Sequence, residues 1–246
     1  MFGSTYQAGI AGDSFGFAGY NHPTRWGSFS VGTIYYNAGS IELNLSSGLR
    51  ERRTAEEDIL GLAGYALRVF PGLWVGGVGK WMRLELAEEA RTKVYAADVG
   101  VLLRPSSWVS GLSLGASLQN LGSGVRFEQE ADPLPKTLRA GAAYDLSFRD
   151  RWVWKDKQEY RLLFLADGVQ VKNENFGANL GLELGILSPD IGLDFSVLRL
   201  GYRPDRTLDS FTIGTGFAFQ RYQLDYAFHP MKNLGSTHQI SFGLRF

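Results

Sequence analysis

The last eight residues of the chain, QISFGLRF (Gln239–Phe246), alternate between two kinds of side chain. Large apolar residues occupy every second position, namely Ile240, Phe242, Leu244 and Phe246, and the residues between them are Ser241, Gly243 and Arg245. Successive side chains of a β-strand point to opposite faces, so the pattern predicts a strand with one apolar and one polar face. The two faces of this last strand are therefore expected to lie in different environments.

The same alternation runs through the sequence from about Gly111 onward, without an intervening helical pattern. In Phe176–Ile186 one face is apolar throughout, and the other holds only glycine, asparagine and glutamate. Similar segments are Leu112–Gln119, Leu138–Ser147, Phe211–Gln220 and Tyr222–His229. The outer face of a soluble β-sandwich is usually rich in Lys, Glu and Thr. The small second face found here indicates a crowded barrel lumen, with the apolar side chains turned outward to lipid.

Composition agrees with one large all-β domain and argues against several other classes. The 246 residues include 25 Lys and Arg and 25 Asp and Glu, so no net charge would draw the chain onto nucleic acid. Cysteine is absent, which removes disulfides and thiolate metal sites. No run of about eighteen apolar residues occurs, so a transmembrane helix is not expected. A spanning β-strand needs only about ten residues with one apolar face.

The breaks between these segments alternate in length. Compact breaks fall at residues 70–72, 104–106, 188–190 and 219–221, and longer polar ones at 40–58, 123–135, 171–175, 203–209 and 229–236. Short turns on one rim and long loops on the other are typical of outer-membrane barrels, although the break at 149–159 is long for the short-turn rim. Counting segments gives about fourteen strands, an even number that places both termini at the periplasmic rim. We therefore predict that residues 1–246 form a single domain, an antiparallel transmembrane β-barrel.

The first third of the chain is less regular. Strands are expected near residues 4–10, 14–20 and 26–37, whereas 41–53 could be a strand extension or an extracellular loop. Lys80 stands out of phase and predicts a β-bulge. Met1–Tyr20 contains no secretory signal peptide, so we expect this sequence to be a mature or shortened form of an exported protein.

Several ordered stretches resemble a known family. They are GLSLGASLQNLG (Gly111–Gly122), DPLPKTLRAGAAY (Asp132–Tyr144), LRLGYRP (Leu198–Pro204) and YQLDYAFHPMKNLGSTHQISFGLRF (Tyr222–Phe246), and they are similar to the PorV/PorQ-type outer-membrane proteins. That family is similar to the long-chain fatty-acid transporter (FadL-like) barrels, so the resemblance implies fourteen strands and an N-terminal plug. The Asn-Pro-Ala motif that members tend to carry before the first strand has no counterpart here. A plug segment is therefore not expected in this sequence.

The C-terminal octet resembles the terminal strand that the barrel-assembly machinery recognises. In this comparison Gln239 is the polar residue, Leu244 and Phe246 are hydrophobic anchors, and Ser241 replaces the usual glycine. An exposed last strand can pair with the edge of another sheet through backbone hydrogen bonds. We predict an assembly signal at Gln239, Ser241, Leu244 and Phe246, with an ordinary closing strand as the alternative.

Isolated charges on the predicted lumen face have mixed signs and are expected to pair across strands. They are Arg139, Asp145, Asp167, Glu183, Arg199, Arg203, Asp225 and Arg245. A selective pore more often carries clustered charge of one sign, so this pattern favours a ladder that keeps the barrel rigid.

The histidines are the residues that a hydrolase could use. His229 and His238 lie near Ser236 and Asp225 in the sequence, but no nucleophile motif accompanies them. We therefore expect no enzymatic activity, no cofactor and no metal site.

Three functions stay open for a barrel in the cell outer membrane of a Gram-negative-type envelope. The first is a structural or partner-binding role, which the family resemblance links to type IX protein secretion. The second is passive transport of hydrophobic solutes, and the third is a barrel-borne hydrolase. The expected partners are outer-membrane lipid, the barrel-assembly machinery, and either secretion-system proteins or a hydrophobic solute, but no nucleic acid. A continuous apolar path through the lumen would favour transport, and a packed lumen would favour the structural role.

Overall fold

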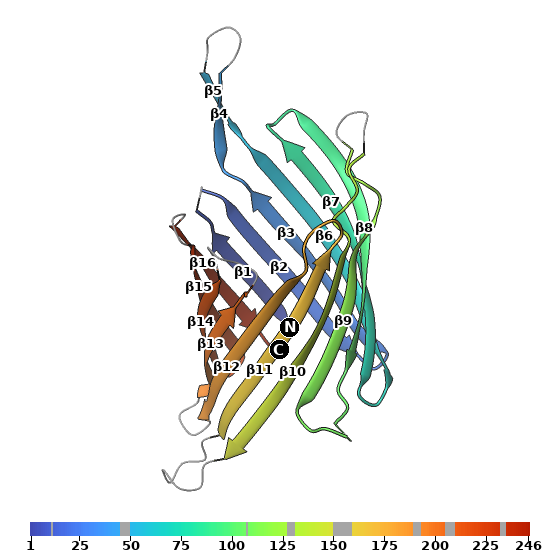
Figure 1. Ribbon diagram of the computed structural model, residues 1–246, viewed down its shortest axis with the longest axis vertical. Helices are drawn as coiled ribbons and strands as arrows, with labels where there is room; N and C mark the ends of the chain where they lie inside the picture. The colour runs from blue at the N-terminus through green and yellow to red at the C-terminus, as the bar shows by residue number, and fades with distance from the viewer. Residues whose placement is uncertain are drawn as a thin grey trace.

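The structure, a computed structural model, describes residues 1–10, 12–44, 50–106, 108–126, 131–149, 159–188, 193–204, 210–231 and 235–246. Within these residues fourteen antiparallel strands form one closed barrel, and two more form a hairpin beyond it (Figure 1). The predicted all-β barrel and its number of strands are therefore confirmed. None of the described residues belongs to a helix that is long and apolar enough to cross a membrane.

The barrel strands follow chain order around the wall, except that β4 and β5 are inserted between β3 and β6. The bounds are β1 Phe2–Ala8, β2 Ser14–Thr24, β3 Gly27–Asn37, β4 Ser40–Asn44, β5 Arg50–Thr54, β6 Glu56–Phe70, β7 Leu73–Leu86, β8 Ala90–Leu103, β9 Leu112–Gly122, β10 Thr137–Arg149, β11 Glu159–Val171, β12 Gly177–Ser188, β13 Leu193–Tyr202, β14 Phe211–Phe219, β15 Tyr222–Met231 and β16 Gly235–Leu244.

A seam between the first and last strands closes the sheet. β1 pairs with β16 from Phe2 opposite Leu244 to Ala8 opposite His238. On the lumen face of this seam, the hydroxyl oxygens of Thr5 and Ser241 lie 2.9 Å apart and share a hydrogen bond. Closure of a sheet leaves no unpaired edge strand.

The two rims carry different connections, with two exceptions to the predicted division into short turns and long loops: the β8–β9 connection is long for the rim with short turns, and the β7–β8 turn is short for the other rim. Both termini lie at the rim that holds the turns after β2, β6, β8 and β14, and we call this the terminal rim. The β4–β5 hairpin belongs to the opposite rim, which we call the hairpin rim, and so does the segment 123–136, by which we mean its described residues 123–126 and 131–136. Much of the predicted breaks at 149–159, 188–190, 203–209 and 229–236 lies outside the described residues.

Side chains alternate between the outer surface and the lumen. The apolar set predicted for the second half faces outward, and Leu138, Leu180 and Ile240 are each about half exposed there. In β6 to β8 the lumen face carries apolar side chains as well, interrupted by charged residues such as Asp58, Lys80 and Asp98. Met82, Val94 and Ala96 are buried there in a cluster with Leu134, which belongs to the segment 123–136. Leu134, with Val125, therefore packs against the lumen wall.

The bulge predicted at Lys80 is wrong in its position. β7 pairs continuously with both neighbours through Lys80, and the register shift lies between β8 and β9, beside Asp98. Asn120 on β9 takes up the extra residue with a positive φ of 59°. Lys80 breaks the sequence pattern because it is a charged residue between two apolar inward positions of its own strand, Val78 and Met82.

Lys80 and the bulge together hold the segment 123–136 in place. The Lys80 Nζ lies 2.7 Å from Asp98 Oδ2 and donates to Asn120 Oδ1 at 2.8 Å. Asn120 donates from its backbone amide to Asp98 Oδ1 at 2.8 Å and from its side-chain amide to the Pro135 carbonyl at 3.0 Å. These contacts hold Pro135 in place, and with it the preceding residue, Leu134, which packs on the apolar cluster.

The sequence leaves a strand extension or an extracellular loop as alternatives for residues 41–53. In the structure, β4 and β5 of this region form a hairpin. The hairpin projects beyond the rim (Figure 1). The turn between β7 and β8 supports its base, because the Ala87 amide donates to the Ala55 carbonyl at 2.9 Å and the Thr54 amide donates to Glu88 Oε1 at 2.8 Å. Arg53 pairs with Glu89 in the same turn.

The support of the hairpin by Glu88 is predicted to depend on pH. Hydrogen bonds from Thr54, the backbone amide first, and then the charge of Arg53 lower the pKa of Glu88. A folded-state pKa below the ordinary value means that the contact is present at neutral pH and is lost as the pH falls through the lowered value. We expect the protection factor of the Thr54 amide in hydrogen exchange to fall as the pH drops through this lowered pKa, below the range in which an ordinary glutamate titrates.

The Ala55 amide is the internal control, because it donates to the Gly39 carbonyl at 2.9 Å and not to a carboxylate. Its protection factor should stay constant over the same pH range. Equal loss at both amides, or no change at Thr54, would contradict the role assigned to Glu88.

Candidate functional site

The candidate site is the lumen, whose wall has two sides of different chemistry. From β10 to β15 the lumen face carries charged side chains that contact one another across strands. From β6 to β10 it carries a hollow with a glycine floor, and apolar side chains continue from this hollow toward the segment 123–136. The two sides are described in turn.

A charge ladder of five side chains crosses β10, β11, β12, β13 and β15, with acids and arginines in alternation. Arg161 lies 2.6 Å from Asp145 and 3.8 Å from Glu183. Arg199 lies 2.7 Å from Glu183 and 2.6 Å from Asp225. Each arginine thus bridges two carboxylates, and mutual pairing satisfies most of the charge on this side.

The ladder depends on Gly216, which lies on β14 between two of its members. Arg199 and Asp225 belong to β13 and β15, so their side chains must meet above the intervening strand. Gly216 is buried beneath them, and a Cβ there would lie 2.2 Å from Asp225 Oδ1 and 3.0 Å from Arg199 Nη1. Any larger residue would have to displace the Asp225 carboxylate from its present position beside Arg199.

A second polar chain lies nearer the hairpin rim. Arg203 donates to the Asn179 side-chain oxygen at 3.0 Å, and the Asn179 amide donates to Asp167. Of the eight predicted lumen charges, the structure brings four into the ladder and joins Asp167 and Arg203 through Asn179. Arg139 and Arg245 make no ion pair with any described residue.

Sequence reasoning missed Arg161, Asn179 and Gly216 as parts of this network. Arg161 lies on β11, where leucines occupy both faces, so alternation did not identify its face. Asn179 and Gly216 were placed on the lumen face, but their contacts depend on the register between strands. A cross-strand register would have been needed to find them.

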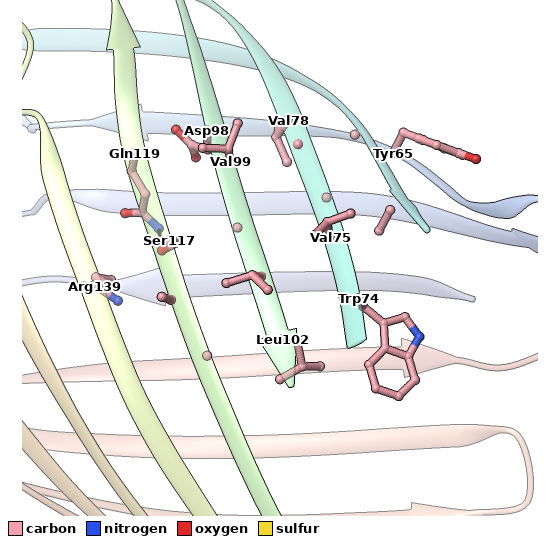
Figure 2. Close-up of a pocket in the computed structure, with 18 of the residues that line it drawn as sticks. Tyr65, Trp74, Val75, Val78, Asp98, Val99, Leu102, Ser117, Gln119 and Arg139 are labelled. Atoms are coloured by element: carbon pink, nitrogen blue, oxygen red, sulfur yellow. Dashed lines mark hydrogen bonds between the residues drawn. The ribbon is translucent and has the colours of Figure 1, made fainter. Parts of the chain in front are cut away.

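The other side of the lumen contains a hollow of about 790 Å³. Glycines from five neighbouring strands, β6 to β10, line it: Gly64, Gly76, Gly100, Gly115 and Gly141. Trp74 and Leu102 lie at one end of the hollow, and Asp98 and Gln119 at the other (Figure 2). The hollow exists because inward positions of adjacent strands lack side chains: Gly76 lies opposite Gly100, and Gly115 lies opposite Gly141.

An apolar stripe extends along β6 from this hollow toward the segment 123–136. Its lumen-facing residues are Leu60, Leu62, Gly64 and Ala66, in that order toward the terminal rim. Leu60 packs on the buried cluster that includes Leu134. The stripe thus provides an apolar surface along the lumen, opposite in character to the charge ladder.

The predicted assembly signal lies in the closing strand. Gln239 and Ser241 face the lumen, and Leu244 lies opposite Phe2 at the terminal rim. Phe246 is 69% exposed, and its ring stacks on Tyr20 with centroids 5.8 Å apart. Because β16 pairs with both β15 and β1, its backbone is accessible to an assembly partner only before the barrel closes.

His238 makes the contacts nearest to a catalytic arrangement. Its Nε2 lies 3.1 Å from the Ser236 hydroxyl and its Nδ1 lies 2.8 Å from the Tyr226 hydroxyl, on the outer surface of β15 and β16. Asp225, the acid considered from the sequence, is on the lumen face and pairs with Arg199. The third group is therefore a phenol and not a carboxylate. Among described residues, no group of three or more His, Asp or Glu side chains could hold a metal ion.

Comparisons with known proteins give a likeness to solved structures. No protein-family model matches the sequence. No curated protein matches it either. Among solved structures, CdiB from Acinetobacter baumannii is similar over 94% of this chain, with 12% sequence identity and a TM-score of 0.48. This chain spans 50% of the length of that protein. At this level of similarity we draw nothing about function from CdiB.

The role of Gly216 gives a prediction for the charge ladder. Gly216→Ala should displace Asp225 from Arg199 and leave a partly buried carboxylate without its counter-charge. We expect a loss of about 1–3 kcal/mol in the free energy of unfolding, measured by urea titration in detergent.

The control variant is Gly16→Ala, because no atom lies within 4 Å of a Cβ at that position. It should unfold like the unmodified chain, apart from the small propensity difference between glycine and alanine. If both variants unfold at the same urea concentration, the ladder does not depend on Gly216.

Proposed function

We propose that the chain spans the outer membrane of a Gram-negative-type envelope and that its lumen takes up a solute. The observation that carries this proposal is the hollow and apolar stripe on the lumen wall. A structural barrel can have a packed lumen, whereas passage or binding of an apolar solute needs a continuous apolar surface. The described part of this lumen offers such a surface along β6.

The outer surface supports the membrane location. Large apolar side chains from strands all around the barrel are exposed there, among them Val31, Tyr95, Leu138, Leu180, Phe217 and Ile240. Soluble monomers rarely expose an apolar surface of this extent. At the terminal rim, Trp26 and Trp108 are 67% and 86% exposed, as expected for aromatic residues at a lipid–water boundary.

A partner-binding barrel of the PorV/PorQ type, linked to type IX secretion, is the second candidate. The β4–β5 hairpin favours it, because it projects beyond the rim where a partner could reach it (Figure 1). The resemblance of Asp132–Tyr144 to that family points the same way. Neither candidate includes a catalytic step, since His238 contacts Ser236 and Tyr226 without a carboxylate.

Heat modifiability tests the membrane barrel directly. We expect the chain to fractionate with the outer membrane and to require detergent for extraction. On a denaturing gel the unheated protein should migrate faster than the boiled protein, because a closed barrel of backbone hydrogen bonds resists the detergent.

The soluble fraction of the same cells, prepared without detergent, provides the control. A soluble monomer obtained without detergent, or identical migration before and after boiling, would overturn the proposed membrane location.

A further inference from the structure

The arginines around the hollow make no ion pair with a described residue, whereas the two acids that line the hollow each have a partner. Asp98 and Asp167 line the hollow, but Lys80 already pairs with the first and the Asn179 amide donates to the second. Arg104 and Arg139 also line the hollow, and neither makes an ion pair with a described residue. The carboxylates that line the hollow therefore already have partners, whereas the guanidinium groups that line it have no carboxylate partner among the described residues.

A third arginine, Arg68, also makes no ion pair with a described residue. It lies on the terminal rim, and its Nε donates to the Phe70 carbonyl at 3.4 Å. It stands directly opposite Trp74 in the pairing of β6 and β7, and its Cζ lies 5.5 Å from the centroid of the Trp74 ring. The Arg104 Cζ lies 5.6 Å from the same ring. The Arg104 amide donates to the Gly72 carbonyl at 2.7 Å, which brings the end of β8 to the turn between β6 and β7. Strand pairing thus holds two guanidinium groups beside one indole.

These groups have the chemistry of an anion site. A guanidinium near an aromatic ring retains planar N–H donors that match a carboxylate or phosphate. The adjoining glycine floor is apolar and small, so an apolar body can approach the backbone closely. The volume of about 790 Å³ falls in the range of small-molecule sites.

We propose that the hollow binds an organic anion of small-molecule size. Arg68 and Arg104 hold its carboxylate or phosphate group at the terminal rim, beside Trp74. The apolar body lies on the glycine floor and extends toward Arg139. This inference rests on the proposed solute-binding lumen and names the chemical class of the solute.

Binding of a model anion to the whole barrel in nanodiscs of zwitterionic lipid tests the proposal. The probes are 2-naphthoate, the uncharged 2-naphthalenemethanol and inorganic phosphate, measured by equilibrium dialysis against empty nanodiscs. We expect saturable binding of 2-naphthoate and no saturable binding of the alcohol. The double variant Arg68→Gln, Arg104→Gln should weaken 2-naphthoate binding by about tenfold or more, because charge-assisted hydrogen bonds are lost.

Arg25→Gln is the matched control for the arginines. Arg25 belongs to the same rim, but its Cζ lies over the exposed Trp26 ring at 4.5 Å and it does not line the hollow. This variant should bind 2-naphthoate like the unmodified chain. An equal loss in the control and the double variant would mean that general rim charge attracts the probe, and would overturn the site.

Gly115→Val tests the floor separately from the charges. Gly115 lines the hollow, and the nearest atom to a Cβ there, the Val101 carbonyl oxygen, is 3.8 Å away, so a side chain can enter the hollow. We expect weaker binding of 2-naphthoate and unchanged binding of inorganic phosphate, which also shows that the variant is folded. Unchanged 2-naphthoate binding would place the anion outside the hollow.

Heat modifiability of each variant separates this proposal from the proposed function. A barrel that shifts on heating but binds 2-naphthoate no better than the alcohol overturns the anion site alone. A chain that never enters the membrane overturns both.

Discussion

The backbone hydrogen bonds between β1 and β16 are the contact on which the rest of the structure depends. They join residues 2–8 to residues 238–244 and turn an open sheet into a closed one. An open sheet of this length would expose two edges of unpaired N–H and C=O groups, which favour aggregation and are excluded from lipid. Closure also defines an inside and an outside, so every alternating strand acquires one lumen face and one outer face. The apolar outer surface and the polar and apolar sides of the lumen follow from that division.

The lumen combines two ways of using the inward positions. On β10 to β15 long charged side chains meet across strands, and Gly216 provides the space for one of the ion pairs. On β6 to β10 glycines occupy neighbouring inward positions and leave a hollow. The first arrangement restrains the wall, and the second leaves room for a ligand. A lumen that has a charge ladder on one side and a hollow on the other can be rigid and still accept a solute. The charge ladder and the proposed solute site are therefore compatible.

Much of the fold could be predicted from alternation, and the reasons for the gaps are physical. In β12 and β16 only one face is apolar, so the sequence shows the strand and its orientation directly. In β6 both faces are apolar, since Ile59 and Leu60 are neighbours that face outward and inward. The period of two therefore disappears from composition in the first third, and Lys80 stood out as an irregularity although it is in register. The hollow depends on glycines from five neighbouring strands, and strand register, which a single sequence does not display, decides which of them lie together. The similarity to PorV/PorQ-type proteins stays a prediction.

The chain has no cysteine, so a pair of introduced cysteines reports the closing seam without background. Thr5 and Ser241 lie directly opposite each other on the lumen face, and Gln7 lies one inward position further along β1. The decisive measurement is disulfide formation under mild oxidation in the folded barrel, for Thr5→Cys with Ser241→Cys and for Gln7→Cys with Ser241→Cys. The closed barrel predicts an efficient cross-link in the first pair and little in the second. Absence of a cross-link in the first pair, or equal yield in both, would contradict closure through β1 and β16.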